Sequence, residues 1–388
     1  MTKKQTYTVA SLSLAIMLTA CGGEDSANEG AQDQPKYLDA HIQMYDCTVT
    51  PEQLTAGLQA RIDEGTEGLT ANGPLYEESI NEGLGKRIVK TNSVPVGHNM
   101  GDFPYVNSMA PANTEYVREN LFEFQMPMIP DQDGTLTQTG GSQTVGVATD
   151  GVHIHQGAGT FYRDDMDSGW QYDIFQTDLI SDYIGETYDL GVDCNTGHPF
   201  PLDGDRTQGL YHYHGAPEAL VPDSPEIKRI GWAADGNPIF ARYGKSDPLD
   251  DESGIKVIEP SYRIKTGTRA GTGGEDGPGG AYDGIFVQDY EYAESYGDLD
   301  ACNGREESVT IDGQTFAYAY YLTDHFPYVP SCLTYTPDES FYLSVNPGGP
   351  GVPTGPAPGD DDFVPPVGGP KPGDDDFVAP DGGMPPAP

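Results

Sequence analysis

The chain has 388 residues and is strongly acidic: 61 Asp and Glu side chains stand against 20 Lys and Arg, for a formal net charge of −41. A surface with this charge repels nucleic acid, so we exclude a nucleic-acid partner. We also expect no nucleotide or organic cofactor.

The first 20 residues are typical of an export signal. Lys3 and Lys4 form a short basic region, and an apolar run follows from Val9 to Ala20. A bilayer span needs about 20 apolar residues, and this run is shorter. We therefore interpret residues 1–20 as a signal peptide.

The apolar run ends at Leu18-Thr19-Ala20-Cys21, which resembles the lipobox of bacterial lipoproteins. The resemblance implies cleavage before Cys21 and lipid chains on that cysteine, which would anchor the chain to the lipid bilayer. The alternative is an ordinary secreted protein with a chance cysteine. Gly22 stands where the inner-membrane retention signal has an aspartate, so the sequence favours the outer membrane if the host is Gram-negative.

Residues 21–40 are polar and predict a tether between the membrane and the folded part. Residues 41–88 predict a helical segment packed on the main domain. Thr50-Pro51-Glu52-Gln53 matches a capping box with proline at the first helical position, and apolar residues recur at helical spacing from Leu54 to Ile62. One short helix should result.

Residues 89–345 predict one large, mainly β domain, a sandwich or a barrel, because short β-prone runs alternate with Asp-Gly turns. An internal repeat supports this interpretation. Residues 146–155 (GVATDGVHIH) align with 231–240 (GWAADGNPIF), and each copy should form an Asp-Gly hairpin. Residues 282–287 (YDGIFV) form a third, weaker copy.

Residues 346–388 consist mainly of Gly, Pro and Asp, and the unit PGDDDFV occurs twice, at 358–364 and 372–378. Two copies cannot bury a face, and proline prevents a hydrogen-bonded ladder. We predict a disordered tail.

Four cysteines remain after the signal peptide, and an even number in an exported chain suggests disulfide bonds. Three pairings are possible. We favour Cys302–Cys332, because both residues lie within one apparent motif block, and Cys47–Cys194 by elimination.

The main chemical feature is a group of histidines. His212 and His214 alternate with two tyrosines in the run YHYH, and His198 lies 14 residues before His212. On a strand, the two histidines would share one face and the tyrosines the other. Together with His198 they could hold one copper or zinc ion with room for water, with Asp235 or a backbone carbonyl orienting the rings. The alternative is a polar face or a pair of hydrogen-bonded core histidines.

His153 and His155 form a second His-x-His pair. They align with Pro238 and Phe240 in the repeat, so that hairpin can be built without histidine. We therefore treat them as secondary metal candidates that lie at the surface. No helper is identifiable for His41 and His325.

Seven blocks occur in order along the chain: VPVGH (94–98), GVDCNTGHP (191–199), YHYHGAP (211–217), GWAADGNPIFARYG (231–244), YDGIFVQDYEY (282–292), DLDACNGR (298–305) and AYYLTDHFPYVPSC (319–332). Over roughly residues 90–345 the chain thus resembles the YHYH domain family of exported bacterial proteins, which has no settled activity. The resemblance implies that His98, like the three histidines above, occupies a recurring motif position, so His98 is a candidate fourth ligand.

The same resemblance includes the block with Asp298, Asp300, Asn303 and Arg305. Its acidic groups could line a site, although support of a turn and a disulfide is the simpler interpretation.

Three functions follow from these features. The first is a membrane-anchored metal-binding protein that sequesters, delivers or senses copper or zinc. The second is a metal-free binding or structural module. The third is a metal-dependent hydrolase or oxidase, whose catalytic residues are unknown because neither G-x-S-x-G nor H-E-x-x-H is present. Whether the chain is an enzyme stays open, and no protein partner is identifiable.

Overall fold

The computed structural model describes residues 36–40, 44–66, 68–103, 117–130, 136–139, 144–185, 191–201 and 209–342. From Tyr37 onward these residues belong to one compact unit. The signal peptide, Cys21, most of the tether, His41 and the tail lie outside the described residues, so the predictions made for them stay predictions.

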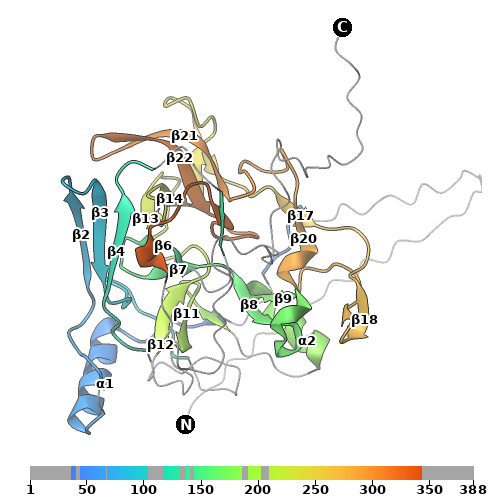
Figure 1. Cartoon of the computed structure of the whole chain (residues 1–388), viewed down its shortest axis with the longest axis horizontal. Coiled ribbons are helices and arrows are strands. Elements are labelled where there is room, and N and C mark those ends of the chain that lie inside the picture. Colours follow the sequence, from blue (N-terminus) through green and yellow to red (C-terminus); the bar gives the residue numbers. More distant parts are fainter. Residues whose placement is uncertain are drawn as a thin grey trace, which may run out of the picture. The chain divides into compact units, whose positions relative to one another are not determined.

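Eight strands form the main sheet, in the order β11-β12-β7-β6-β13-β14-β22-β21 (Figure 1). The sheet is open, with β11 and β21 at its two edges. The predicted mainly β fold is confirmed, and it is not a closed barrel. The strands are β6 (Thr144–Ala148), β7 (His153–His155), β11 (Gly197–Pro201), β12 (Gly209–Tyr213), β13 (Arg229–Ala233), β14 (Pro238–Ala241), β21 (Gly304–Ile311) and β22 (Gln314–Leu322).

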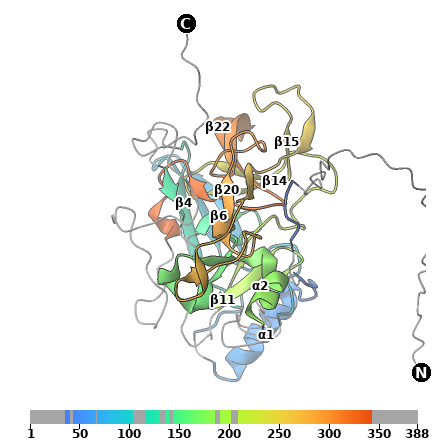
Figure 2. The same ribbon diagram turned by 90° about the vertical axis from the view of Figure 1, so that its right-hand side faces the viewer.

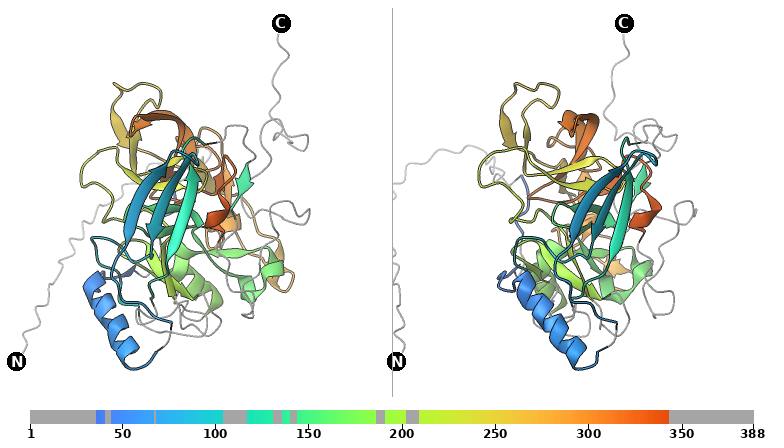
Figure 3. Two further views of the ribbon diagram at one scale, coloured as in Figure 1. Left: turned by 60° about the vertical axis from the view of Figure 1, so that its left-hand side comes forward. Right: turned by 90° about the vertical axis from the view of Figure 1, so that its left-hand side faces the viewer.

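A three-stranded sheet packs on one face of the main sheet (Figure 3). Phe122 and Phe124 place their rings 4.4 and 4.7 Å from the ring of His153 in β7. The guanidinium of Arg87 lies 3.8 Å from the centre of the Trp232 ring in β13. These contacts make a two-layered core. The second layer consists of β2 (Tyr76–Asn81), β3 (Lys86–Thr91) and β4 (Phe122–Pro127).

β2 and the first half of β3 lie in the segment in which the sequence predicted only a helix, residues 41–88. The runs YEESIN in β2 and KRIVKT in β3 alternate between covered and exposed side chains. This period of two is the pattern of a half-buried strand. Two inward positions hid it, because they carry charged residues, Glu78 and Arg87, that pair with each other.

The predicted helix is α1 (Pro51–Asp63), and its capping box is formed. The Gln53 backbone N–H donates to the Thr50 hydroxyl, and the Thr50 backbone N–H donates to the Gln53 side chain over 2.8 Å. A second helix, α2 (Thr177–Ile184), was not predicted because it is only eight residues long. Figure 2 shows both helices at the lower end of the molecule. No helix among the described residues has the length and apolar character to cross a membrane.

Short strand pairs and single turns of 3₁₀-helix complete the described structure. The pairs are β1 (Met44–Tyr45) with β10 (Val192–Asp193), β5 (Thr137–Gln138) with β23 (Cys332–Leu333), β8 (Ala158–Phe161) with β9 (Gln171–Asp173), β15 (Tyr243–Lys245) with β16 (Ile255–Val257), β17 (Tyr262–Ile264) with β20 (Tyr290–Tyr292), and β18 (Gly271–Gly274) with β19 (Gly277–Pro278). The 3₁₀ turns are η2 (Tyr162–Asp164), η3 (Met166–Ser168), η4 (Ile174–Gln176), η5 (Val287–Asp289) and η6 (Glu339–Phe341).

The internal repeat corresponds to the centre of the main sheet. Both predicted hairpins are present, β6–β7 and β13–β14, and β6 pairs with β13 between them. The two Asp-Gly turns match closely, because Gly151 and Gly236 have φ angles of 91° and 89°. The third predicted copy, at 282–287, is not a hairpin: a bend there leads into η5.

The duplication extends to four strands in each half of the main sheet. The first half consists of β6, β7, β12 and β11, and the second half consists of β13, β14, β22 and β21. β12 runs parallel to β7, β22 runs parallel to β14, and β11 and β21 pair antiparallel with them at the edges. The register agrees in both halves: Tyr213 lies opposite Gly197 and Ile154, and Tyr320 lies opposite Gly304 and Ile239.

Tyrosine–aspartate hydrogen bonds repeat in the same way. Tyr213 donates to Asp150 over 2.5 Å, and Tyr320 donates to Asp235 over 2.7 Å. Each bond ties a strand to the Asp-Gly turn of its neighbouring hairpin. Burial raises the pKa of Asp235, and the hydroxyl of Tyr320 opposes this by stabilising the carboxylate. A second pair of equivalent bonds joins Tyr211 to Asp193 and Tyr318 to Asp300.

Both favoured disulfides are formed. Cys47 bonds to Cys194 and Cys302 bonds to Cys332, with Cα–Cα separations of 5.7 and 4.7 Å. The first ties the segment before α1 to the turn that precedes β11.

The two disulfides should contribute unequally to stability. They close loops of 147 and 30 residues. In the chain-entropy model, losing the Cys47–Cys194 bond costs about 5 kcal/mol and losing the Cys302–Cys332 bond about 3.5 kcal/mol. Urea unfolding of the two double Cys→Ser variants measures both costs. Equal stability losses in the two variants, or a larger loss in the Cys302/Cys332 variant, would contradict the expectation.

Candidate metal centre

The pairing of β11 with β12 brings the three main histidines to one face of the sheet. His198 lies directly opposite His212 in the antiparallel register. His214 follows β12 two residues after His212, so it projects to the same side. The hydroxyls of Tyr211 and Tyr213 bond to aspartates on the opposite side, as the strand prediction required.

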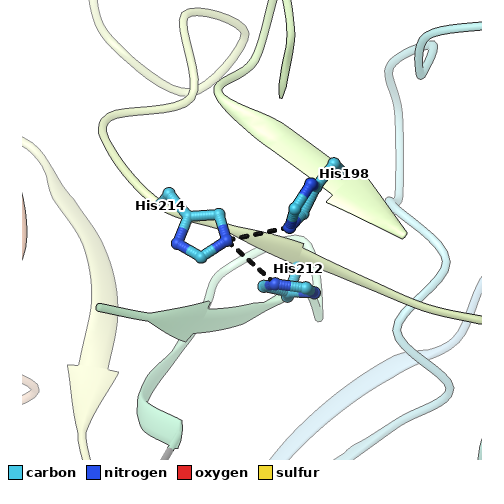
Figure 4. A group of neighbouring side chains, drawn as sticks. All are labelled: His198, His212 and His214. Carbon is cyan, nitrogen blue, oxygen red and sulfur yellow. Dashed lines mark hydrogen bonds between the residues drawn. The ribbon is translucent and has the colours of Figure 1, made fainter. Parts of the chain in front are cut away.

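The ring nitrogens of these histidines converge. The Nε2 atom of His214 lies 3.0 Å from Nε2 of His212 and 3.0 Å from Nε2 of His198. The three potential ligand atoms all lie within 4.8 Å of one another, and each side chain is at most 3% exposed. Figure 4 shows the three rings turned toward one another. We call this group the histidine triad.

Backbone carbonyls orient two of the rings. Nδ1 of His212 donates to the carbonyl of Leu210 over 2.9 Å, and Nδ1 of His214 donates to the carbonyl of Gln156. A carbonyl only accepts, so each Nδ1 carries the hydrogen and each neutral ring has its lone pair on Nε2. The sequence predicted that either Asp235 or a backbone carbonyl would orient the rings, and in the structure backbone carbonyls do so. Asp235 instead bonds to Tyr320 and to the backbone N–H of Asn237.

Burial keeps the triad uncharged. It lowers the pKa of His212 to about 4, and it lowers the pKa values of His198 and His214 well below the usual value, with the neighbouring imidazoles adding to the effect. Near pH 7 the lone pairs of His212 and His214 therefore face each other with no hydrogen between them. A positive ion would turn this repulsion into attraction. The triad can thus act as a ligand set for a metal ion.

His153 and His155 are buried, which corrects the expectation that they lie at the surface. The reason is the position of β7, which lies between β6 and β12 and is covered by β4. The ring of His155 lies 4.4 Å from that of His212, and its Nε2 bonds to the hydroxyl of Thr144 over 3.0 Å. His153 and His155 are therefore neighbours of the triad and not members of it.

His98 does not join the triad. Its Nε2 lies 2.8 Å from a carboxylate oxygen of Asp150 and 2.7 Å from the hydroxyl of Tyr213, on the other side of β12. Its Nδ1 donates to the carbonyl of Asn99. Burial alone would lower the pKa of His98, but the hydrogen bond and charge of Asp150 outweigh it and raise the pKa. His325, the other described histidine, stacks on Tyr37 at 4.6 Å.

The acidic block of the second half supports a turn and does not line the triad. Asp300 accepts from the backbone N–H groups of Cys302 and Gly304, and Asp298 pairs with Lys256 over 2.5 Å. The side chain of Asn303 donates to the Tyr321 carbonyl and to a threonine hydroxyl. These contacts agree with the interpretation that this block supports a turn and a disulfide.

In the second half, the positions of the triad carry other residues. The shared register aligns His198 with Arg305 and His212 with Ala319, and continuing along the strand aligns His214 with Tyr321. Arg305 donates from Nε to Glu307 over 3.0 Å and from its terminal nitrogen to the Tyr321 hydroxyl over 3.1 Å. Sequence reasoning missed this cluster because only the strand register aligns it with the triad.

These observations define a duplicated β-sheet protein with a buried histidine triad in one half. A family model described as YHYH protein matches residues 123–334, which is more than half of the chain. The chain therefore belongs to the YHYH family. The matched region contains the triad and both hairpins, whereas His98 and Cys47 precede it. No curated protein and no solved structure matches the chain.

Without metal, the triad should make the protein less stable in mild acid. Burial lowers the pKa of His212 to about 4 in the folded protein, below the ordinary value of about 6.5, so the unfolded chain binds more protons. Stability is therefore complete above about pH 6.5 and falls as the pH drops toward 4, by up to about 1.4 kcal/mol per pH unit per histidine.

Urea unfolding in the presence of a chelator at pH 7 and pH 5 measures this loss. The variant His212→Gln/His214→Gln should lose less stability than the wild type between the two pH values. Equal losses would show that the triad is not the source of the acid sensitivity.

Proposed function

We propose that this protein binds a transition-metal ion, copper or zinc, through His198, His212 and His214 on the outside of the cytoplasmic membrane. One observation carries the proposal: three buried imidazoles converge through Nε2 while backbone carbonyls hold the Nδ1 hydrogens of two of them. Such outer hydrogen bonds are typical of metal-ligating histidines, because they fix the tautomer and the ring orientation. Sequestering, delivering or sensing the ion are the roles that this site supports.

The second half of the sheet argues against a purely structural role for the triad. There the same strand pair is built with Arg305, Ala319 and Tyr321 at the corresponding positions. The fold therefore does not need histidine for packing. Three buried, uncharged imidazoles, two of them with facing lone pairs, are a costly way to fill a core, and this cost favours a ligand over a packing function.

The same geometry favours binding over catalysis. A metal-dependent hydrolase or oxidase needs an acid–base partner beside the ion. Tyr211 and Tyr213 point to the other side of the strand, and among the described residues no carboxylate joins the triad. We therefore propose a binding protein rather than an enzyme.

The proposed location rests on the start of the chain. A basic region, a short apolar run and Leu-Thr-Ala-Cys21 precede a polar tether, and the two disulfides suit an oxidising compartment outside the cytoplasm. We propose that lipid on Cys21 anchors the domain to the cell envelope, in the outer membrane if the host is Gram-negative.

Metal analysis tests the proposed site. The mature protein, purified without an affinity tag and supplied with Cu or Zn, should bind one ion per chain. His198→Gln, His212→Gln and His214→Gln should each weaken binding by roughly 100-fold or more, because loss of a ligand costs at least as much as loss of an outer hydrogen bond to a ligand.

His98→Gln is the matched control, since the structure places His98 on the other side of β12. This variant should retain the ion, and circular dichroism should show that all variants are folded. If the wild type binds neither ion, or if the triad variants bind as tightly as His98→Gln does, the proposed function fails.

Membrane anchoring is tested by changing one residue. In cells, Cys21→Ser should lose incorporation of labelled fatty acid and should move from the membrane fraction to the soluble fraction, because the acyl chains supply the anchor. Cys47→Ser is the control, since Cys47 lies in a disulfide and should not affect lipid attachment. Unchanged labelling of Cys21→Ser would contradict the lipoprotein interpretation.

A further inference from the structure

The triad offers a metal ion no negative charge. Its three ligands are imidazoles, which coordinate a metal ion as neutral rings. Within the described residues, no carboxylate or thiolate belongs to the group of ligand atoms. The histidine that lies against the triad, His155, adds no carboxylate either, and its Nε2 bonds to the hydroxyl of Thr144. Any bound ion would therefore keep its full charge in a buried site.

Two carboxylates bond to the tyrosines of β12, on the side of the strand opposite the triad. Asp150 accepts from Tyr213 and lies 2.8 Å from Nε2 of His98. Asp193 accepts from Tyr211 and from backbone N–H groups, among them that of Gly101. Neither is placed to compensate an ion held by the triad.

The second half shows how this fold accommodates a buried positive charge. Arg305 stands at the position of His198, and it pairs with the carboxylate of Glu307, which is 1% exposed. In the first half, β11 reads GHPFP and contains no acidic residue. The strand β11 of the first half thus lacks the carboxylate that balances the positive charge of Arg305 in the second half.

Charge then discriminates between ions. The solvation cost of moving an ion into a low-dielectric interior rises with the square of its charge, so a divalent ion costs about four times as much as a monovalent one. Cu²⁺ also prefers a tetragonal set of N and O ligands, and the triad supplies three nitrogens. Zn²⁺ would need a bound hydroxide to reduce its net charge.

We propose that the triad selects monovalent copper, Cu⁺, over Cu²⁺ and Zn²⁺. This inference rests on the proposed function and adds the identity and oxidation state of the ion. It assigns to the protein the handling of reduced copper.

Competition titrations of the mature full-length protein test the inference. Under anaerobic conditions, Cu⁺ is titrated against a chromogenic Cu⁺ chelator, and Zn²⁺ and Cu²⁺ are titrated against chelators of known affinity. We expect one Cu⁺ per chain, bound at least 100-fold more tightly than either divalent ion, and a complex without a Cu²⁺ paramagnetic resonance signal.

Two other outcomes are informative. If Zn²⁺ or Cu²⁺ binds as tightly as Cu⁺ and is lost in His214→Gln, the selectivity inference is overturned while the proposed metal site stands. If none of the three ions binds, the proposed function itself fails and the inference falls with it.

A pair of isosteric variants tests the charge argument directly. His155→Glu and His155→Gln place side chains of similar size beside His212, and only the first adds a negative charge. The Glu variant should narrow the preference for Cu⁺ over Zn²⁺ by at least tenfold relative to the Gln variant. Equal preferences in two folded variants would show that charge does not set the selectivity.

Discussion

The antiparallel register of β11 and β12 determines the whole candidate site. It places His198 opposite His212, and a slip of one residue would turn the histidines to the other face. The tyrosines of β12 oppose such a slip, because the hydroxyls of Tyr211 and Tyr213 are bonded to Asp193 and Asp150. One side of the strand thus holds the register, and the other side carries the triad.

The duplicated sheet separates what the fold needs from what the site adds. Both halves have the tyrosines, the aspartates and a glycine, Gly197 or Gly304, that makes room for a tyrosine ring where a Cβ atom would clash. These residues build the strands and turns. The histidines occur in one half, and an arginine, an alanine and a tyrosine replace them in the other. The triad is therefore an addition to a scaffold that folds without it.

Much of this arrangement could be predicted from local patterns. Strand alternation placed His212 and His214 on one face, the Asp-Gly dipeptides located both hairpins, and the capping box located α1. The burial of His153 could not be predicted, because it depends on β4, which is distant in sequence. The orientation of the rings also escaped prediction, because the carbonyls of Leu210 and Gln156 belong to the backbone and have no sequence pattern. The position of His98 likewise depends on a long-range contact, with Asp150.

Five of the seven histidines that the structure describes are buried, which determines how an ion would act on the molecule. In the metal-free state, the facing lone pairs of His212 and His214 repel each other at the end of β12, next to His198 on β11. An ion removes this repulsion only in the folded state, since the unfolded chain does not hold the three rings together. Binding of an ion would therefore be coupled to folding, and the edge of the sheet at β11, which carries His198, is the part whose order an ion would increase most.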